Sequence, residues 1–341
     1  MIPKAQIFSI TKDLIYENFY NYFLKKEFDK TNHIILDRFF PDERRTTSIM
    51  AGLQTSLGSY WEKLAKKFAS LNGFEIIENS ALKKPKFVNP KWQDLINKTK
   101  EYRETQGGDL IKFKEKLNQL YDPSLKDREL TKLTKGKGAD LILSKEDQIY
   151  IFDIKTVQVN ANSGNLFNES LILWTAYWKY INGIDANNIN AKLIIPYNSS
   201  NEENDESWWD EFGDRVSPCS NADLLIGNNF WSFVSGNNEA LSYMVKAFNY
   251  ISEDSLFIDL YRKSFSLKNE NEIKQFKTKL KLSRISQIKN VIYHPDNESF
   301  SMKKKLKWIH KDCVFCEKFN KLLNGNNYKC PTCGEYLKQS L

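Results

Sequence analysis

The chain has 341 residues, of which 41% are hydrophobic and 13% aromatic. That is enough apolar material for one or two folded domains and too much for a disordered protein. Its 50 Lys and Arg outnumber its 43 Asp and Glu, giving a net charge of +7. The apolar runs are too short to cross a membrane and the first residues do not resemble a signal peptide, so we expect a cytoplasmic protein.

The charge is unevenly spread along the chain. Residues 261–312 contain 14 Lys and Arg against 5 Asp and Glu, whereas residues 201–214 contain seven acids and no base. A basic segment of this kind suits a polyanion such as nucleic acid, but it is equally typical of a solvated helix face. We expect the acidic stretch to be exposed, with Trp208 and Trp209 packed inward.

Hydrophobic periodicity and turn residues predict the elements in chain order. They are helices at 5–28 and 55–71, a strand at 74–79, a hairpin at 138–156, a helix from 166 to Gly183, a strand at 191–198, and helices at 237–252 and 269–280. The segment 80–137 is charged, contains three prolines and has a helical stretch near 109–121, so we interpret it as a recognition insertion. The fold class expected is mixed α/β.

The hairpin GADLILSKEDQIYIFDIKT (138–156) places acids where packing would favour apolar residues. A turn at 146–147 sets Asp140 opposite Asp153 in an antiparallel pair. Directly opposed residues lie on the same face of a sheet, and Lys155 shares that face because strand side chains alternate. The hairpin therefore gathers two carboxylates and an ammonium group.

Opposed like charges cost roughly 0.2–1 kcal/mol in a sheet. A divalent cation reverses this penalty, because the carboxylates of Asp140 and Asp153 then become its ligands, and Mg²⁺ prefers oxygen ligands and keeps several waters. Lys155 could position a water or offset charge that develops on a phosphate. The alternative is an edge hairpin whose polar face meets solvent, with Lys155 offsetting the two acids.

The hairpin and its neighbours, over about residues 50–200, resemble the PD-(D/E)xK nuclease superfamily, and in particular type II restriction endonucleases. Their α-β-β-β-α-β core carries an Asp on the second strand and an acid-x-Lys motif on the third. Asp140 and the run Asp153-Ile154-Lys155 fill these positions, and the Pro of the family name is replaced by Ala in "GAD".

The resemblance also implies a third acid on the helix before the first strand. Glu62 lies there, and its alternative interpretation is a surface residue paired with Lys66 one helical turn away. Polar residues beyond the catalytic lysine often support such sites, which makes Gln158 and Asn160 candidates for DNA binding. Both could equally belong to a polar loop.

By this resemblance the protein is a Mg²⁺-dependent, sequence-specific double-stranded DNA endonuclease that leaves 5′-phosphate ends. Asp140, Asp153 and Lys155 would be catalytic, with Glu62 as a further candidate, and the three acids would bind Mg²⁺. We further expect a prokaryotic protein, a homodimer if the recognised site is palindromic, and a companion DNA methyltransferase.

Four of the five cysteines form a second motif, Cys313-x₂-Cys316-x₁₃-Cys330-x₂-Cys333. This spacing is typical of a zinc ribbon with one tetrahedral structural Zn²⁺, which leaves no open position for catalysis. Two disulfides are the alternative, disfavoured in a reducing cytoplasm, and His310 could compete as a ligand.

The remaining cysteine, Cys219, is expected to be a small buried residue. A lysine-rich segment precedes the zinc ribbon and suits contact with DNA phosphates; its lysines are Lys303, Lys304, Lys305 and Lys307. The ribbon could equally serve in protein docking or dimer stabilisation.

We therefore predict a nuclease domain at 1–260 and a C-terminal part at 261–341, formed by the basic segment and the zinc ribbon (313–333). Three alternatives stay open. They are a repair, phage or transposon-related nuclease on the same core, a non-catalytic zinc-ribbon DNA-binding protein, and a ribbon-bearing regulatory protein that acts on RNA.

Overall fold

The structure is a computed structural model of the chain. It describes residues 1–26, 38, 41–123, 129–134, 136–155, 163–198, 207–254, 258, 261–267, 269–292, 306–307 and 338–339, with no side chains described at 41, 42, 45, 282–292, 306–307 and 338–339. The chain divides into two compact units: Met1–Lys4 with Leu57–Ser242, and Ala5–Ser56 with Tyr243–Leu341. The division into domains at 1–260 and 261–341 stays a prediction.

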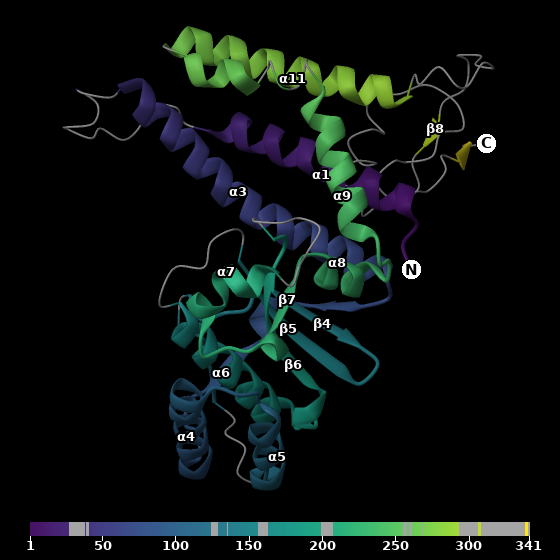
Figure 1. The fold of residues 1–341 in the computed structure, drawn as a ribbon. Coiled ribbons are helices and arrows are strands. Elements are labelled where there is room, and N and C mark those ends of the chain that lie inside the picture. The colour runs from purple at the N-terminus through teal and green to yellow at the C-terminus, as the bar shows by residue number, and fades with distance from the viewer. Residues whose placement is uncertain are drawn as a thin grey trace. The chain divides into compact units, whose positions relative to one another are not determined.

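A five-stranded mixed sheet lies at the centre of the first unit (Figure 1), in the order β1-β4-β5-β6-β7. Its strands are β1 (Glu75–Ile77), β4 (Leu141–Lys145), β5 (Gln148–Ile154), β6 (Ile189–Ile195) and β7 (Leu224–Ile226). β1, β4 and β5 pair antiparallel, whereas β5, β6 and β7 pair parallel. The predicted mixed α/β class is confirmed.

The elements around the hairpin follow the predicted order of helix, strand, strand, strand, helix and strand. They are α3, β1, β4, β5, α6 and β6, in which α3 is Pro41–Leu71 and α6 is Gly164–Asn182. The insertion between β1 and β4 contains η1 (Asn79–Ala81), β2 (Lys83–Pro85), α4 (Pro90–Gln106), α5 (Ile111–Leu120) and β3 (Leu130–Lys132). The other elements of the first unit are η3 (Ala186–Asn188), α7 (Ser207–Val216), η4 (Asn221–Asp223) and α8 (Gly227–Ser235).

Two helices differ from the expectation, and in both the difference lies at a proline. α3 begins at Pro41 rather than near residue 55, and Pro90 begins α4, which was not predicted. A proline lacks a backbone N–H and has a fixed φ, so it fits the first turn of a helix although it breaks a helix interior. At α4 the side chain of Asn89 caps the helix by accepting from the backbone N–H of Lys91 at 2.9 Å.

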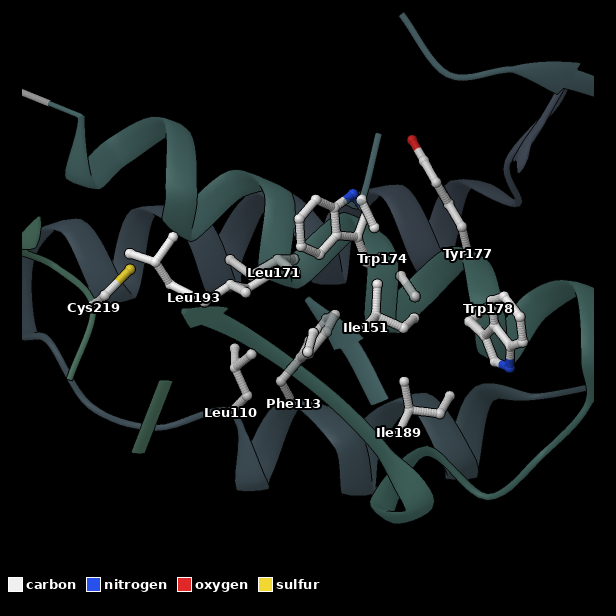
Figure 2. Packing of buried hydrophobic residues seen from close by; sticks show 14 of the residues in the cluster. Leu110, Phe113, Ile151, Leu171, Trp174, Tyr177, Trp178, Ile189, Leu193 and Cys219 are labelled. Carbon is white, nitrogen blue, oxygen red and sulfur yellow. The ribbon is translucent and has the colours of Figure 1, made fainter. Parts of the chain in front are cut away.

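The core of the first unit forms where α6 packs against the sheet (Figure 2). Trp174 and Leu171 of α6 meet Ile151 of β5 and Leu193 of β6, all almost fully buried. Phe113 of α5 joins the same cluster, so the insertion shares the core of the sheet. α6 ends, as predicted, at Gly183 in the left-handed conformation that glycine adopts most readily.

The backbone approaches itself closely where α6 begins. A Cβ at Gly164 would lie 1.8 Å from the carbonyl oxygen of Ser217, so no other residue fits there without backbone movement. The Sγ of Cys219 lies 3.9 Å from the carbonyl oxygen of Gly164, and Cys219 is buried as predicted. Trp208 is buried and Trp209 packs against the same core, which confirms their predicted inward orientation.

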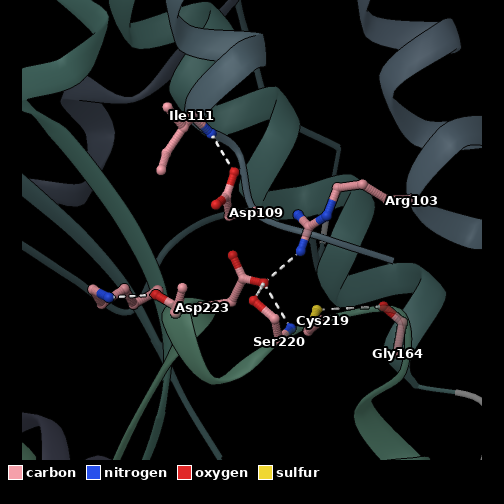
Figure 3. A network of polar contacts seen from close by, with 9 residues as sticks. Arg103, Asp109, Ile111, Gly164, Cys219, Ser220 and Asp223 are labelled. Atoms are coloured by element: carbon pink, nitrogen blue, oxygen red, sulfur yellow. Dashed lines mark hydrogen bonds and ion pairs between the residues drawn. The ribbon is translucent and has the colours of Figure 1, made fainter. Parts of the chain in front are cut away.

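A buried ion pair ties the insertion to the strand at the far side of the sheet (Figure 3). Arg103 of α4 pairs with Asp223, directly before β7, and their side chains are 0% and 5% exposed. The same carboxyl oxygen of Asp223 accepts from the backbone N–H of Ser220 at 2.8 Å and from its hydroxyl at 3.0 Å. Among the described residues the Nε and Nη1 atoms of Arg103 have no partner.

The second unit contains α1 (Lys4–Lys25), the first part of α3, α9 (Ala240–Ser252), η5 (Lys263–Ser266), α11 (Glu270–Ile292), and the short pair β8 (Leu306–Lys307) and β9 (Lys338–Gln339). Phe23 lies at the centre of an aromatic cluster, with ring centroids 4.8 Å from Tyr261 and 6.1 Å from Phe276. No helix among the described residues is long and apolar enough to span a membrane.

We expect Arg103→Met to lower the free energy of unfolding by about 3–5 kcal/mol, because it leaves Asp223 as a buried charge without its partner. The matched control is Lys98→Met, which removes an ion pair with Asp94 on the same helix, where both side chains are more than half exposed. That pair should contribute less than about 1 kcal/mol. Urea unfolding of both variants measures the difference, and equal losses would contradict a special role for the buried pair.

Candidate active site

The β4–β5 hairpin has the register expected from the sequence. Its turn lies at residues 146–147, and Leu141 pairs with Phe152. Asp140 directly precedes β4, and its backbone N–H donates to the carbonyl oxygen of Phe152 at 2.8 Å. Asp140 thus lies one residue before the paired register of β4, and its carboxyl forms a hydrogen bond with the carboxyl of Asp153.

Backbone hydrogen bonds hold the three polar residues of the hairpin in place. The carboxylate of Asp140 accepts from the backbone N–H of Ile154 at 2.8 Å. The Nζ of Lys155 lies 2.8 Å from both carboxylate oxygens of Asp153. The backbone N–H of Lys155 donates to Ile194 of β6 at 2.9 Å, which extends the parallel ladder beyond the end of β5.

The environment of Asp153 strongly disfavours its ionised form. The pKa of Asp153 is raised to about 7, mainly by burial and also by a hydrogen bond with the carboxyl of Asp140, while the charge of Lys155 opposes the rise. The side chain of Asp153 is only 14% exposed, against 39% for Lys155. Desolvation thus exceeds the attraction of the ammonium group, and this carboxyl resists ionisation in the metal-free protein.

The carboxyl group of Glu62, on α3, also interacts electrostatically with this site. Burial raises the pKa of this half-buried residue, and the negative charge of Asp140 raises it further, whereas Lys66 and Lys63 oppose the rise. The helix before the first strand therefore brings a third carboxyl into the electrostatic range of the hairpin. Lys66 influences Glu62 as well, so the role of Glu62 as a metal ligand or as a partner of Lys66 stays a prediction.

The donor set suits a hard cation. Asp140 and Asp153 supply adjacent carboxylate oxygens, the ligand type that Mg²⁺ prefers, and their mutual repulsion would be relieved by positive charge between them. Within the described part of the chain, no group of three or more His, Cys, Asp or Glu side chains is close enough to hold a metal ion.

Two residues near the site were not identified from the sequence. The side chain of Asn79 donates to the carbonyl oxygen of Asp140 at 3.0 Å, and its own Oδ1 is buried without a partner among the described residues. The ring centroid of Phe167, on α6, lies 5.7 Å from the Nζ of Lys155. Asn79 precedes Asp140 by 61 residues, and no sequence pattern links positions so far apart.

The remaining predicted site residues lie outside the described side chains. Lys307 belongs to β8, for which only the backbone is described. The others are Gln158, Asn160, Lys303, Lys304, Lys305, His310, Cys313, Cys316, Cys330 and Cys333. Cys219 is described, and burial raises the pKa of its thiol to about 12, so it stays protonated and unreactive.

We expect Asp153→Asn to stabilise the metal-free protein at pH 8 by about 1–3 kcal/mol. The folded protein holds the proton of Asp153 more tightly than the unfolded chain does, since the pKa rises from 3.8 to about 7. The free energy of unfolding should therefore fall as the pH rises through this window.

Urea unfolding in EDTA at pH 4.5 and pH 8 measures this effect. The gain from Asp153→Asn should shrink at pH 4.5, where the carboxyl is largely protonated in the folded state. Asp147→Asn, in the exposed turn of the same hairpin, is the control and should change little at either pH. A loss of stability on Asp153→Asn at pH 8 would contradict the expectation.

Comparison with known protein families places this geometry in context. A family model described as "Type II restriction endonuclease, HinfI" matches residues 4–252, which include Asp140, Asp153 and Lys155. No curated protein matches the chain. Because the family model spans well over half of the sequence, the chain belongs to the HinfI family of type II restriction endonucleases and is a site-specific deoxyribonuclease.

Proposed function

We propose that the protein cleaves both strands of a specific DNA sequence in a Mg²⁺-dependent reaction that leaves 5′-phosphate and 3′-hydroxyl ends. Type II restriction endonucleases generally use Mg²⁺, and the chain belongs to such a family. The observation that carries the proposal is the close approach of the carboxyl groups of Asp140 and Asp153, which share a hydrogen bond, with the Nζ of Lys155 2.8 Å from Asp153. The family favours this function over that of a non-catalytic DNA-binding protein.

The order α3, β1, β4, β5, α6 and β6 supports the further proposal that the core is of the PD-(D/E)xK type. Asp140 precedes its second strand, Asp153 lies on its third, and Lys155 directly follows. The alternatives on the same core, a repair or phage-related nuclease, are less favoured because the matching family is one of restriction enzymes.

In this proposal Asp140 and Asp153 hold the Mg²⁺ ion, with Glu62 as a third candidate. The bound ion supplies positive charge for the phosphate oxygens and lowers the pKa of a water molecule. Lys155 orients the attacking water and offsets negative charge that develops on the phosphate. The water oxygen forms a bond to phosphorus as the bond from phosphorus to O3′ breaks, and the 3′ oxygen takes up a proton.

The substrate class suggests the partners. A palindromic site would require a homodimer, since two-fold symmetric DNA presents the same contacts twice. A companion DNA methyltransferase in a prokaryotic cytoplasm would protect the host genome. Gln158 and Asn160, beyond Lys155, remain candidates for contacts with bases, and Lys303, Lys304, Lys305 and Lys307 for contacts with phosphates.

We also propose that Cys313, Cys316, Cys330 and Cys333 bind one structural Zn²⁺. The support is the spacing of the two Cys-x₂-Cys pairs. Cys219 is excluded from this set by its burial and its protonated thiol.

We expect Asp140→Ala and Lys155→Ala each to lower the rate of Mg²⁺-dependent plasmid cleavage by roughly 10²-fold or more, because each removes a group that acts on the reacting phosphate. Asp147→Ala, at the opposite end of the hairpin, is the matched control and should keep the wild-type rate. Gel-shift binding without Mg²⁺ shows whether the inactive variants still bind DNA. Full activity in either variant would refute the assigned site.

We expect one zinc ion per chain in the purified protein, measured by elemental analysis. Cys313→Ser or Cys330→Ser should abolish it, because a four-thiolate site loses a ligand in each case. Cys219→Ala should retain the metal. Zinc that persists in both ligand variants, or is absent from the wild type, would contradict the zinc ribbon.

A further inference from the structure

The two-stranded ribbon formed by β2 and β3 carries like charges opposite each other. Lys83 pairs with Lys132 in its register, so their side chains lie on the same face, and Lys84 lies opposite Thr131 on the other. All three lysines are exposed. Like charges directly opposed destabilise a sheet pair, and within the described residues none of the three forms an ion pair.

Other lysines near the ribbon have acidic partners. Lys86 pairs with Glu129 at 2.5 Å, and Lys137 pairs with Glu169 of α6 at 2.6 Å. Lys98 of α4 pairs with Asp94 of the same helix. The ribbon differs from these positions in that two of its lysines, Lys83 and Lys132, are directly opposed and have no acidic partner among the described residues, as expected of a surface that meets a polyanion.

The ribbon is anchored to the first unit by packing at one end and closed by a backbone hydrogen bond at the other. Leu82, directly before β2, is buried in the core of the first unit, and Leu133, directly after β3, packs against that core. Pro85 is buried, and the backbone N–H of Lys86 donates to the carbonyl oxygen of Glu129 at 2.9 Å. The lysines are therefore presented from a fixed backbone, which lowers the entropy lost when they bind a partner.

The ribbon begins close to the candidate active site. Asn79, which donates to the carbonyl oxygen of Asp140, precedes Lys83 by four residues. An extended chain spans at most about 3.6 Å per residue, so the Cα atoms of Asn79 and Lys83 are no more than about 14 Å apart. On one DNA strand, with about 3.4 Å of rise per phosphate, this corresponds to roughly four nucleotides.

We propose that the β2–β3 ribbon contacts the DNA backbone beside the cleaved bond. Lys83 and Lys132 bind phosphate groups, and Lys84 lies at the edge of the contact. The inference rests on the proposed nuclease function and names the surface that holds its substrate. Contacts to phosphates position a duplex without reading its sequence. The ribbon therefore strengthens binding and leaves the choice of recognition site to other residues.

The test is the salt dependence of DNA binding by a Lys83→Gln/Lys132→Gln double variant. The control is Lys112→Gln/Lys116→Gln, which removes the same two charges from exposed positions of α5 in the same insertion. Dissociation constants for a duplex are measured without Mg²⁺ over a range of KCl concentrations. The Mg²⁺-dependent rate at saturating DNA and the cleavage site are then compared with those of the wild type.

We expect the ribbon variant to lose roughly tenfold or more in affinity at low salt. Its plot of log affinity against log salt should be shallower by about 1.8, because each phosphate contact contributes about 0.9 to the slope. The control should keep the wild-type slope, and the ribbon variant should keep the cleavage site and, within about twofold, the rate at saturating DNA.

An unchanged slope in the ribbon variant, or an equal change in the control, would overturn the inference. A changed cleavage site would overturn it as well, because it would mean that the ribbon reads bases. Failure of the nuclease proposal gives a different result, in which the wild type binds DNA but Mg²⁺ produces no cleavage. The binding measurement needs no catalysis, so the two failures are distinguishable.

Discussion

The antiparallel pairing of β4 with β5 is the constraint on which the site depends. It brings Asp140, directly before β4, close to Asp153 of β5. The carboxyl of Asp140 is held in place because it also accepts from the backbone N–H of Ile154 at 2.8 Å. The repulsion and desolvation that raise the pKa of Asp153 are thus built into the backbone. Such a concentration of negative charge is unfavourable for the isolated protein and favourable once a cation is bound.

Packing and hydrogen bonds from the rest of the first unit support this hairpin. The large side chains of α6 pack against β5 and β6, and Phe167 of the same helix lies near the ammonium group of Lys155. Asn79 ties the start of the insertion to the backbone of Asp140, and the pair of Arg103 with Asp223 ties the insertion to the segment before β7. A site that must hold reacting groups in register benefits from such support, because small displacements reduce catalysis strongly.

The insertion combines a structural role with the DNA contact proposed for its ribbon. Its helix α5 contributes Phe113 to the common core, while its ribbon presents Lys83, Lys84 and Lys132 to solvent. If the proposed site is correct, a duplex bound at Asp140 would pass close to the ribbon, which begins four residues after Asn79. The recognition role that the sequence suggests for residues 80–137 stays a prediction, separate from the phosphate contacts proposed for the ribbon.

The sequence alone determined the hairpin, its register and the three residues at its open end, because alternation with period 2 and a recognisable turn fix which side chains share a face. It also predicted α6 and its end at Gly183. It did not predict that α3 begins at Pro41 or that Pro90 begins the helix α4. A proline is compatible with the first turn of a helix but not with its interior, so its effect depends on whether a helix follows. Only the tertiary structure decided the position of Asn79 near Asp140 and the burial of Arg103 against Asp223, 120 residues away. Contacts between such distant positions follow from how the elements pack, which no local pattern encodes.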